Sequence, residues 1–314
     1  MMFKTFHLDG KFLVTGATGS VGHHIVRLLS DKGISVRAAV HSPEKDERLH
    51  LPGVEQVRMD FMDVDSVRKG MVGIQRMYLI TPAAEYMADM TRNLVDEAKR
   101  AGVELVVKQS VIGAGGANPS DLGKRYRHAE QLVEWSGISY VTLRPNAFMQ
   151  NLITAHGRDI RERDEFYCPS GSGSISMIDA RDVAAAGVEA LTNERHANRE
   201  FTITGPAALT HAEMAEILSK AVGRNISFTA VEETAARQAM LNAGISSWCA
   251  EAMIEHYQAV LLGERSVVTD DFERLTQRTP SKFENFVNDY AGLFTSEKKD
   301  RSLGSLTERN GANE

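Results

Sequence analysis

The first 145 residues alternate short apolar runs with longer amphipathic stretches, and this rhythm constrains the fold more than any other feature of the chain. Six apolar runs predict β-strands: KFLVT (11–15), SVRAAV (35–40), EQVRMDF (55–61), RMYLIT (76–81), ELVVKQS (104–110) and SYVTLR (139–144). The amphipathic stretches between them predict helices over 21–32, 63–71, 85–102 and 123–137. Strands joined by crossover helices indicate an α/β fold with a doubly wound, Rossmann-type parallel sheet.

The second half of the chain lacks this regular alternation. Residues 146–294 mix helices with isolated strands at 172–179, 199–205 and 225–231, which predicts a smaller C-terminal α+β lobe that mainly binds a substrate. Residues 1–145 would form the sheet domain, with later strands free to return to its sheet. Asp179, at the start of an amphipathic stretch, is expected to cap a helix. The polar residues 295–314 are expected to form a disordered tail.

Composition and charge argue against several classes of function. A formal net charge of -6, without a dense run of Lys and Arg, argues against a nucleic-acid partner. Two cysteines, Cys168 and Cys249, are too few for a disulfide framework or a zinc site and fit a reducing compartment. No stretch has the ~18 apolar residues of a membrane span, so we expect a soluble, cytoplasmic protein. His23 and His24 have no further ligand at metal spacing, and no metal site is expected.

Three glycines, Gly16, Gly19 and Gly22, stand between the first predicted strand and the first predicted helix. At such a junction, unpaired backbone N–H groups and the helix dipole together favour a bound anion. The spacing G-x-x-G-x-x-G is one residue longer at its first step than the commonest dinucleotide fingerprint. In an alternating chain, this loop predicts a cradle for the pyrophosphate of a dinucleotide.

The end of the second predicted strand bears on which dinucleotide binds. An acid that would bind the ribose of NAD is missing from VRAAVHSPEK, which instead offers Arg37, His41, Ser42 and Lys45. These donors and positive charges favour the 2′-phosphate of NADPH. NADH remains an alternative, because the same side chains are also compatible with an ordinary solvated surface.

Later motifs add a family resemblance. The runs VTGATGSVG, MDFMD, GISYVTLRPNAFMQN, SISMIDARDVAAAGVEAL and FTITGPAALTHAEMAEILSKAVGR together resemble the NmrA-like branch of the atypical short-chain dehydrogenases, from about Lys11 to Phe294. The resemblance implies a Rossmann domain with a small C-terminal substrate lobe. Members of this branch include NAD(P)H-dependent quinone reductases, triphenylmethane-dye reductases and iminium-reducing enzymes, and others are non-catalytic dinucleotide sensors.

The resemblance also implies which positions contact the cofactor. It places Gly16, Thr18, Gly19, Ser20, Val21 and Gly22 around the pyrophosphate, and Asp60 and Phe61 beside the adenine. Thr81 and Pro82 would lie along the ribose, while Gln109 and Ser110 would approach the nicotinamide. Pro145, Asn146, Ala147 and Phe148 would close over the nicotinamide side. Ligands of open α/β sheets gather at these carboxyl ends of strands.

The sequence lacks the tyrosine and lysine pair that most short-chain dehydrogenases use as a proton relay. None of the seven tyrosines precedes a lysine by four residues, and Tyr126 stands where the lysine is expected. Without general acid catalysis, reduction of a ketone loses roughly 10²–10⁴-fold in rate. We therefore expect hydride transfer to a conjugated acceptor such as a quinone, an iminium ion or a cationic dye. Tyr126, Ser110 and Lys124 are the candidates for polar help in catalysis.

The substrate is expected to be a small apolar or aromatic molecule. Candidate lining residues are Phe148, Met149, Tyr167, Met177, Trp248 and Tyr257, although core packing explains each of them equally well. The alternative to an enzyme is a non-catalytic NADP(H) sensor that acts through a protein partner. The chain is expected to be a monomer or a homodimer.

Overall fold

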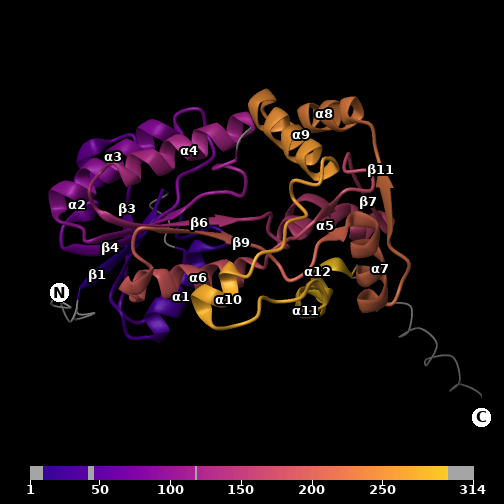
Figure 1. The fold of residues 1–314 in the computed structure, drawn as a ribbon. Helices are drawn as coiled ribbons and strands as arrows, with labels where there is room; N and C mark the ends of the chain where they lie inside the picture. The colour runs from indigo at the N-terminus through magenta and orange to yellow at the C-terminus, as the bar shows by residue number, and fades with distance from the viewer. Residues whose placement is uncertain (1–9, 42–45, 117–118, 296–314) are drawn as a thin grey trace, which may run out of the picture.

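The computed structural model describes residues 10–41, 46–116 and 119–295, and its centre is a parallel sheet. The seven strands follow the order β3-β2-β1-β4-β5-β6-β9 (Figure 1). They are β1 (Lys11–Val14), β2 (Val36–Val40), β3 (Val54–Arg58), β4 (Ile74–Leu79), β5 (Leu105–Gln109), β6 (Ser139–Pro145) and β9 (Arg199–Ile203). The six strands predicted before residue 145 are confirmed, and their order is that of a doubly wound sheet.

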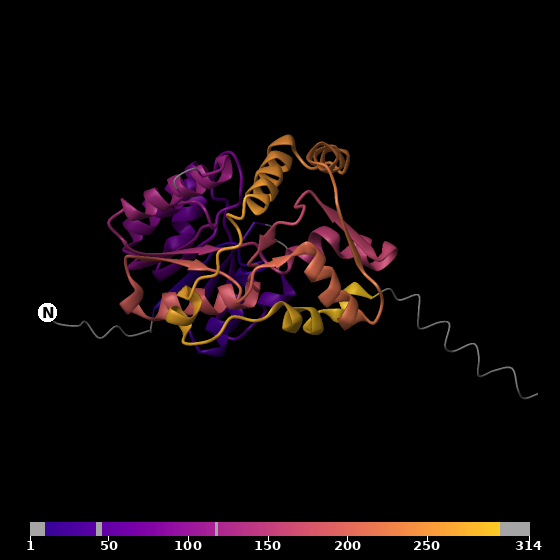
Figure 2. The ribbon, with the colours of Figure 1, turned by 45° about the vertical axis from the view of Figure 1, so that its right-hand side comes forward.

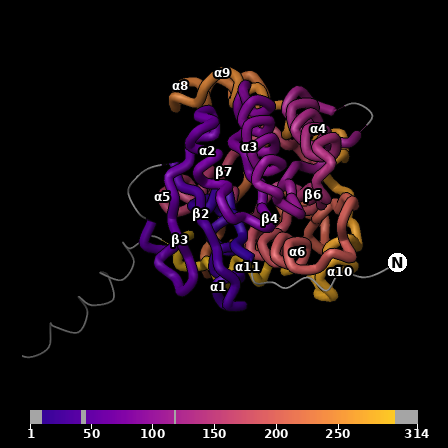
Figure 3. The backbone as a smooth tube through the Cα atoms, turned by 90° about the vertical axis from the view of Figure 1, so that its left-hand side faces the viewer, coloured from indigo at the N-terminus to yellow at the C-terminus, as the bar shows by residue number. Residues whose placement is uncertain are grey.

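Helices cover both faces of this sheet (Figure 3). One face carries α2 (Val64–Met71), α3 (Met87–Ala101) and α4 (Asp121–Glu134), which confirm three of the four predicted helices. The other face carries α1 (Gly22–Asp31), α6 (Ala180–Thr192) and α10 (Asp271–Thr276). Side chains alternate across a strand, so Leu13 packs into the core under α2 and α3, while Phe12 and Val14 pack into the core under α1 and α6.

The second half of the chain returns to the main sheet before it completes the smaller lobe. The strand predicted at 199–205 is β9, which pairs in parallel with β6 and extends the sheet by one strand. Helix α6 packs beside α1, on the face opposite α3. Residues after 145 therefore build part of the sheet layer as well as the lobe.

The C-terminal lobe surrounds two small sheets at the carboxyl side of the main sheet (Figure 1). One is the antiparallel pair of β8 (Ser174–Ile175) and β10 (Leu209–Thr210), and the other is the parallel pair of β7 (Glu165–Cys168) and β11 (Ser227–Ala230). The lobe helices are α5 (Asn151–Arg163), α7 (His211–Val222), α8 (Glu233–Asn242), α9 (Ser247–Leu261), α11 (Phe283–Asp289) and α12 (Ala291–Phe294). The strand predicted at 172–179 shrinks to the two residues of β8, while β7 and β10 were not predicted. These short strands pair only over long sequence distances, which local periodicity does not reveal.

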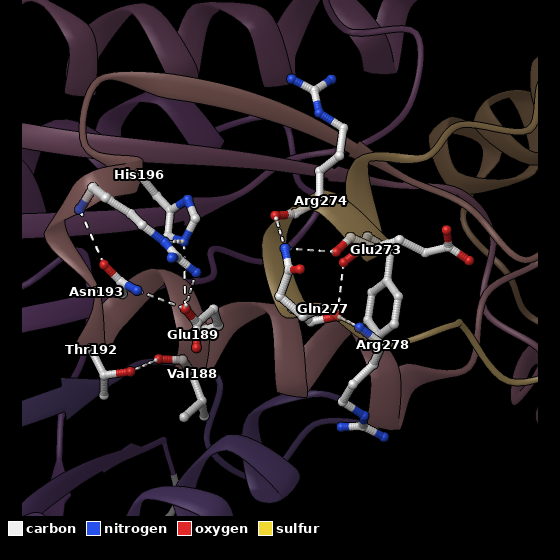
Figure 4. Close-up of polar contacts among 12 residues, drawn as sticks. Val188, Glu189, Thr192, Asn193, His196, Glu273, Arg274, Gln277 and Arg278 are labelled. Carbon is white, nitrogen blue, oxygen red and sulfur yellow. Dashed lines mark hydrogen bonds and ion pairs between the residues drawn. The ribbon is translucent and has the colours of Figure 1, made fainter.

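Two single-turn 3-10 helices, η1 (Glu47–Leu49) and η2 (Glu194–His196), complete the described elements. Asp179 caps α6 as predicted, because its carboxylate accepts the backbone N–H of Arg181 at 2.8 Å. Figure 4 shows the other end of α6, where Asn193 donates to the Glu189 carboxylate at 2.9 Å. Close by, Gln277 follows the last residue of α10 as its C-cap, and its φ of 58° lies in the left-handed region. Both helices under the sheet therefore have fixed ends.

Two kinds of feature are missing from the part of the chain that the structure describes. Within residues 10–41, 46–116 and 119–295, no group of three or more His, Cys, Asp and Glu side chains is arranged to hold a metal ion. No helix within these ranges has both the length and the apolar character to cross a membrane.

Candidate functional site

A cavity of about 550 Å³ lies at the carboxyl ends of the central strands. Its walls come from the glycine loop after β1 and from the segments that end or follow β2 to β6. The lining residues are Gly16, Thr18, Gly19, Ser20, Val21, Ala39, Val40, His41, Met59, Asp60, Phe61, Met62, Ile80, Pro82, Tyr86, Met90, Gln109 and Phe148. Many of the predicted cofactor residues are thus brought together in one cavity.

The glycine loop folds tightly at the mouth of α1. Gly16 has a φ of 61°, a conformation that favours glycine, and its carbonyl accepts the Gly19 N–H at 3.0 Å. A Cβ on Gly22 would lie 2.1 Å from the Gly16 carbonyl oxygen, so only glycine allows the helix to start this close to the turn. This agrees with the close-packing role predicted for Gly22.

Helix α1 presents an unpaired N-terminus to the cavity. Its N-cap residue, Val21, makes no capping hydrogen bond through its side chain, and the first turn contains no acid. Among the described residues, the backbone N–H groups of Ser20, Val21 and Gly22 have no acceptor. Unpaired donors at a helix N-terminus favour a bound anion. The start of α1 is therefore suited to bind the pyrophosphate of a dinucleotide.

Arg48 lies beside the glycine loop and was missed by the sequence analysis. From η1, its guanidinium donates to the Thr18 carbonyl at 3.0 Å and pairs with Asp46 at 2.5 Å, while 57% of its side chain stays exposed. His41, Asp60 and Phe61, which were predicted to contact the cofactor, line the cavity near the glycine loop. Arg48 does not line the cavity but lies next to the loop, so two basic side chains stand near this end.

Arg37, which was predicted to contact the cofactor, does not line the cavity. Its guanidinium pairs with Glu55 at 3.0 Å and donates to the carbonyls of Gly70 and Val72 at 2.9 and 2.8 Å. Arg37 is the second residue of β2, three residues before the strand's carboxyl end, or about 10 Å away along the strand. It therefore ties β2 to its neighbours and stays outside the cavity. Ser42 and Lys45 lie outside the described residues.

Gln109 and Phe148 line the far end of the cavity, while several neighbours predicted to contact the cofactor do not. Asn146 is buried, and its amide nitrogen donates to Ser176 Oγ and to the Arg265 carbonyl, both at 2.9 Å. Thr81, Ser110 and Pro145 are also buried and absent from the lining. These buried residues pack beneath the residues that line the cavity. Pro82 lies on its surface as predicted.

Lys108 is a buried lysine next to this end of the site, and the sequence analysis passed over it. Its ammonium donates to the Gln109 carbonyl at 2.7 Å and lies 3.5 Å from the Thr81 hydroxyl, with no exposed surface. Burial lowers the pKa of Lys108 to about 8, against a smaller opposing influence of Glu130. The side chain therefore fixes the backbone just where Gln109 enters the cavity.

The three catalytic candidates do not form a catalytic group. Tyr126 is half-buried with its ring 5.5 Å from Lys108 Nζ, and burial raises the pKa of its phenol. Lys108 Nζ lies over the Tyr126 ring, and its hydrogen bonds go to Thr81 and Gln109 and not to the Tyr126 hydroxyl. The two residues therefore do not replace the missing tyrosine and lysine relay. Lys124 is exposed on α4. Ser110 is buried beside Glu130. Burial alone would raise the pKa of the Glu130 carboxyl, but hydrogen bonds from Arg144, Ser110 and Arg127 together lower it.

The six predicted substrate residues are also dispersed. Phe148 lines the large cavity, but Met149 and Met177 line a second cavity of about 230 Å³ in the C-terminal lobe. The Tyr167 hydroxyl donates to Glu165 at 2.7 Å, and the ring of Trp248 lies 5.7 Å from the Arg125 guanidinium. Tyr257 is 9% exposed, with its ring beside those of His211 and His256. Of the six residues, Phe148 is the one that lines the large cavity.

Several lining residues were not predicted, among them Tyr86 and Met90 near the start of α3. The others stand at strand ends: Ala39, Val40, Met59, Met62 and Ile80. The rule that ligands bind at the carboxyl ends of parallel strands points to these positions.

Comparison with known proteins now adds to this geometry. A sequence model of the NmrA-like family matches residues 9–290. The chain belongs to the NmrA-like family. It is 35% identical over 282 residues to an NAD(P)H azoreductase of Xenophilus azovorans, covering 90% of this chain and 98% of the relative.

One further relative and one solved structure extend the comparison. A (4-alkanoyl-5-oxo-2,5-dihydrofuran-3-yl)methyl phosphate reductase of Streptomyces griseus is 31% identical over 287 residues, which cover 91% of this chain and 99% of the relative. The crystal structure of an NADPH-dependent quinone oxidoreductase from Escherichia coli, complexed with NADPH, superposes with a TM-score of 0.80. At 22% identity, with 89% of this chain and 99% of the other covered, that structure supports the fold. The family and the fold expected from the sequence are confirmed.

Proposed function

We propose that this protein is an NADPH-dependent reductase that transfers hydride to a conjugated small-molecule acceptor. The observation that carries the proposal is the continuous cavity from the unpaired N-terminus of α1 to Gln109 and Phe148. Such a cavity suits an extended dinucleotide with its phosphates at the helix and its nicotinamide at β5.

Each part of the cavity has a separate task in this proposal. The N–H groups of Ser20, Val21 and Gly22 hold the pyrophosphate. Arg48 and His41 bind a 2′-phosphate by donating hydrogen bonds to it. Bound NADPH supplies the hydride. Phe148 and the aliphatic part of Gln109 exclude water and orient the reacting faces, and such positioning is worth several powers of ten in rate.

The acceptor class follows from the absent relay. Tyr126 does not line the cavity, and burial makes its phenol a weaker proton donor by raising its pKa. Quinones, iminium ions and dye cations gain hydride to give stabilised anions or neutral products, so solvent can supply any later proton. The azo, quinone and unsaturated-lactone acceptors in the names of the relatives are also conjugated.

A panel of acceptors tests this proposal. NADPH oxidation is followed at the nicotinamide absorbance with a naphthoquinone, an azo dye, a triarylmethane cation, a cyclic iminium ion and an aromatic ketone. We expect turnover of conjugated acceptors, with the ketone slower by roughly 100-fold or more because no proton donor assists it. Tight NADPH binding without turnover of any acceptor would instead favour the dinucleotide sensor.

Arg48→Ala tests the preference for NADPH. Removal of the guanidinium beside Thr18 should raise the KM for NADPH roughly tenfold and leave the KM for NADH unchanged, because only NADPH carries the 2′-phosphate. The exposed Arg158→Ala in the C-terminal lobe is a matched control and should change neither KM. Equal losses with both cofactors would show that Arg48 holds the loop and not the phosphate.

A further inference from the structure

Arg265 is a buried arginine whose side chain has no hydrogen-bonding partner among the residues that the structure describes. Only 8% of the residue is exposed, and Nε is fully buried without an acceptor. Among the described residues, the nearest carboxylate is that of Glu264, at 3.9 Å and itself about half exposed. A buried guanidinium normally has acceptors for its five N–H groups, because an unpaired buried charge is costly.

The backbone at Arg265 is held at the carboxyl end of β6. Its carbonyl accepts the Asn146 amide at 2.9 Å and the Ser176 N–H at 3.0 Å. Asn146 stands two residues before Phe148, which lines the cavity. In Figure 2, the coil that leaves α9 passes the ends of the sheet strands on its way to α10. Arg265 does not line the cavity itself, but its backbone is tied to the segment that leads from β6 to Phe148 at the far end of the cavity.

The guanidinium lies over the loop that follows β5. A Cβ on Gly113 would be 3.0 Å from Arg265 Nη1 and 3.3 Å from Nη2, and Gly113 has a φ of 89°. Gly113 stands four residues after Gln109, the β5 residue that lines the cavity. The bare glycine backbone thus makes room for the arginine fork between the two segments that close the far end of the site.

The charge of Arg265 is only partly compensated. Glu264 forms an ion pair with it at 3.9 Å, through a side chain that is 52% exposed. His256 on α9 adds no positive charge at pH 7, because burial and then the charge of Arg265 lower its pKa to about 4. The guanidinium near the far end of the site therefore has one long, half-exposed ion pair and, within the described residues, no hydrogen bond.

We propose that Arg265 binds an oxyanion of the acceptor, so that the preferred substrates are conjugated molecules that carry a carboxylate, sulfonate or phosphate group. That the bound molecule is a substrate rests on the proposed reductase function. The binding of the anion by Arg265 does not depend on it. A planar guanidinium pairs with such a group through two parallel hydrogen bonds. The anion would supply the acceptors that the buried fork lacks.

The test compares two dyes of the same shape, para-phenylazobenzoate and para-phenylazobenzamide. Their affinities for the complex of the protein with NADP⁺ are measured by calorimetry. We expect the benzoate to bind roughly 10- to 100-fold more tightly, because the ionised group gains charge-assisted hydrogen bonds. Arg265→Gln should remove this difference, Arg265→Lys should keep part of it, and both should bind NADP⁺ as the wild type does.

Arg274→Gln, an exposed arginine on α10, is the matched control and should keep the full preference. Equal affinities of the two dyes for the wild type would overturn the inference, even if an Arg265 variant failed to fold. An equal loss for both dyes in Arg265→Gln would also overturn it and would indicate a structural role. An Arg265-dependent preference would support the anion site even if the acceptor panel rejected the reductase.

Discussion

Gly22→Ala should reduce the affinity for NADPH by roughly 100-fold, the equivalent of about 3 kcal/mol. The new Cβ would lie 2.1 Å from the Gly16 carbonyl oxygen, 2.8 Å from its carbonyl carbon and 2.9 Å from the Ala17 Cα. These are backbone atoms, so relief requires the turn or the start of α1 to move. Either movement breaks the arrangement of N–H groups that receives the pyrophosphate. Titration of NADPH fluorescence measures the loss.

Two control variants separate the cradle from general stability. Gly19→Ala adds a methyl group 3.3 Å from the Gly16 oxygen and on the cavity wall, so it should weaken NADPH binding with a smaller loss of stability. Gly292→Ala in α12 meets no atom within 4 Å and should change neither property. Unchanged NADPH affinity in Gly22→Ala would contradict the assignment of the glycine loop as the phosphate site.

Lys108→Met should raise the free energy of unfolding by about 1–3 kcal/mol at pH 7. The folded state lowers the pKa of Lys108 from 10.5 to about 8, mainly through burial. The unfolded chain therefore binds more protons between pH 8 and pH 10.5, and the wild type gains stability as the pH rises through this window. The methionine variant lacks this gain, so its advantage should be full below pH 8 and vanish above pH 10.5.

Urea unfolding at the two ends of that pH window measures the effect. Lys124→Met, on the exposed side of α4, is the control and should change stability by less than about 0.5 kcal/mol. A lower stability of Lys108→Met at pH 7 would show that the bond to the Gln109 carbonyl outweighs the cost of the buried charge. Retention of a destabilising lysine beside Gln109 is the trade-off expected at a functional site.

The sheet and the phosphate cradle were predictable because their signals are local. Each strand from β1 to β6 is a short run with apolar residues at most of its inward-facing positions, and the three glycines stand within seven residues of one another. Asp179 was recognised as a cap for the same reason. Arg37 lies outside the cavity because a residue three positions before a strand end lies about 10 Å from the ligand edge.

The rest of the site depends on contacts between distant segments. Arg48 reaches Thr18 across 30 residues, and Asn146 holds the Arg265 carbonyl across 119 residues. Met149 follows β6 and Met177 follows β8 of the lobe, and both pack with Met214 and Phe283 around the smaller cavity. No periodicity or spacing in one sequence encodes such pairings, because they depend on how the lobe folds back onto the sheet.

Deuterium transfer tests the central claim most directly. NADPH with deuterium on one face or on the other face of nicotinamide C4 is incubated, in separate reactions, with the protein and a triarylmethane dye, whose central carbon retains any hydrogen that it gains. Our account predicts deuterium at that carbon in the reduced dye, transferred from one face of the nicotinamide. Oxidation of NADPH with no deuterium in the reduced dye from either reaction would contradict direct hydride transfer in this cavity.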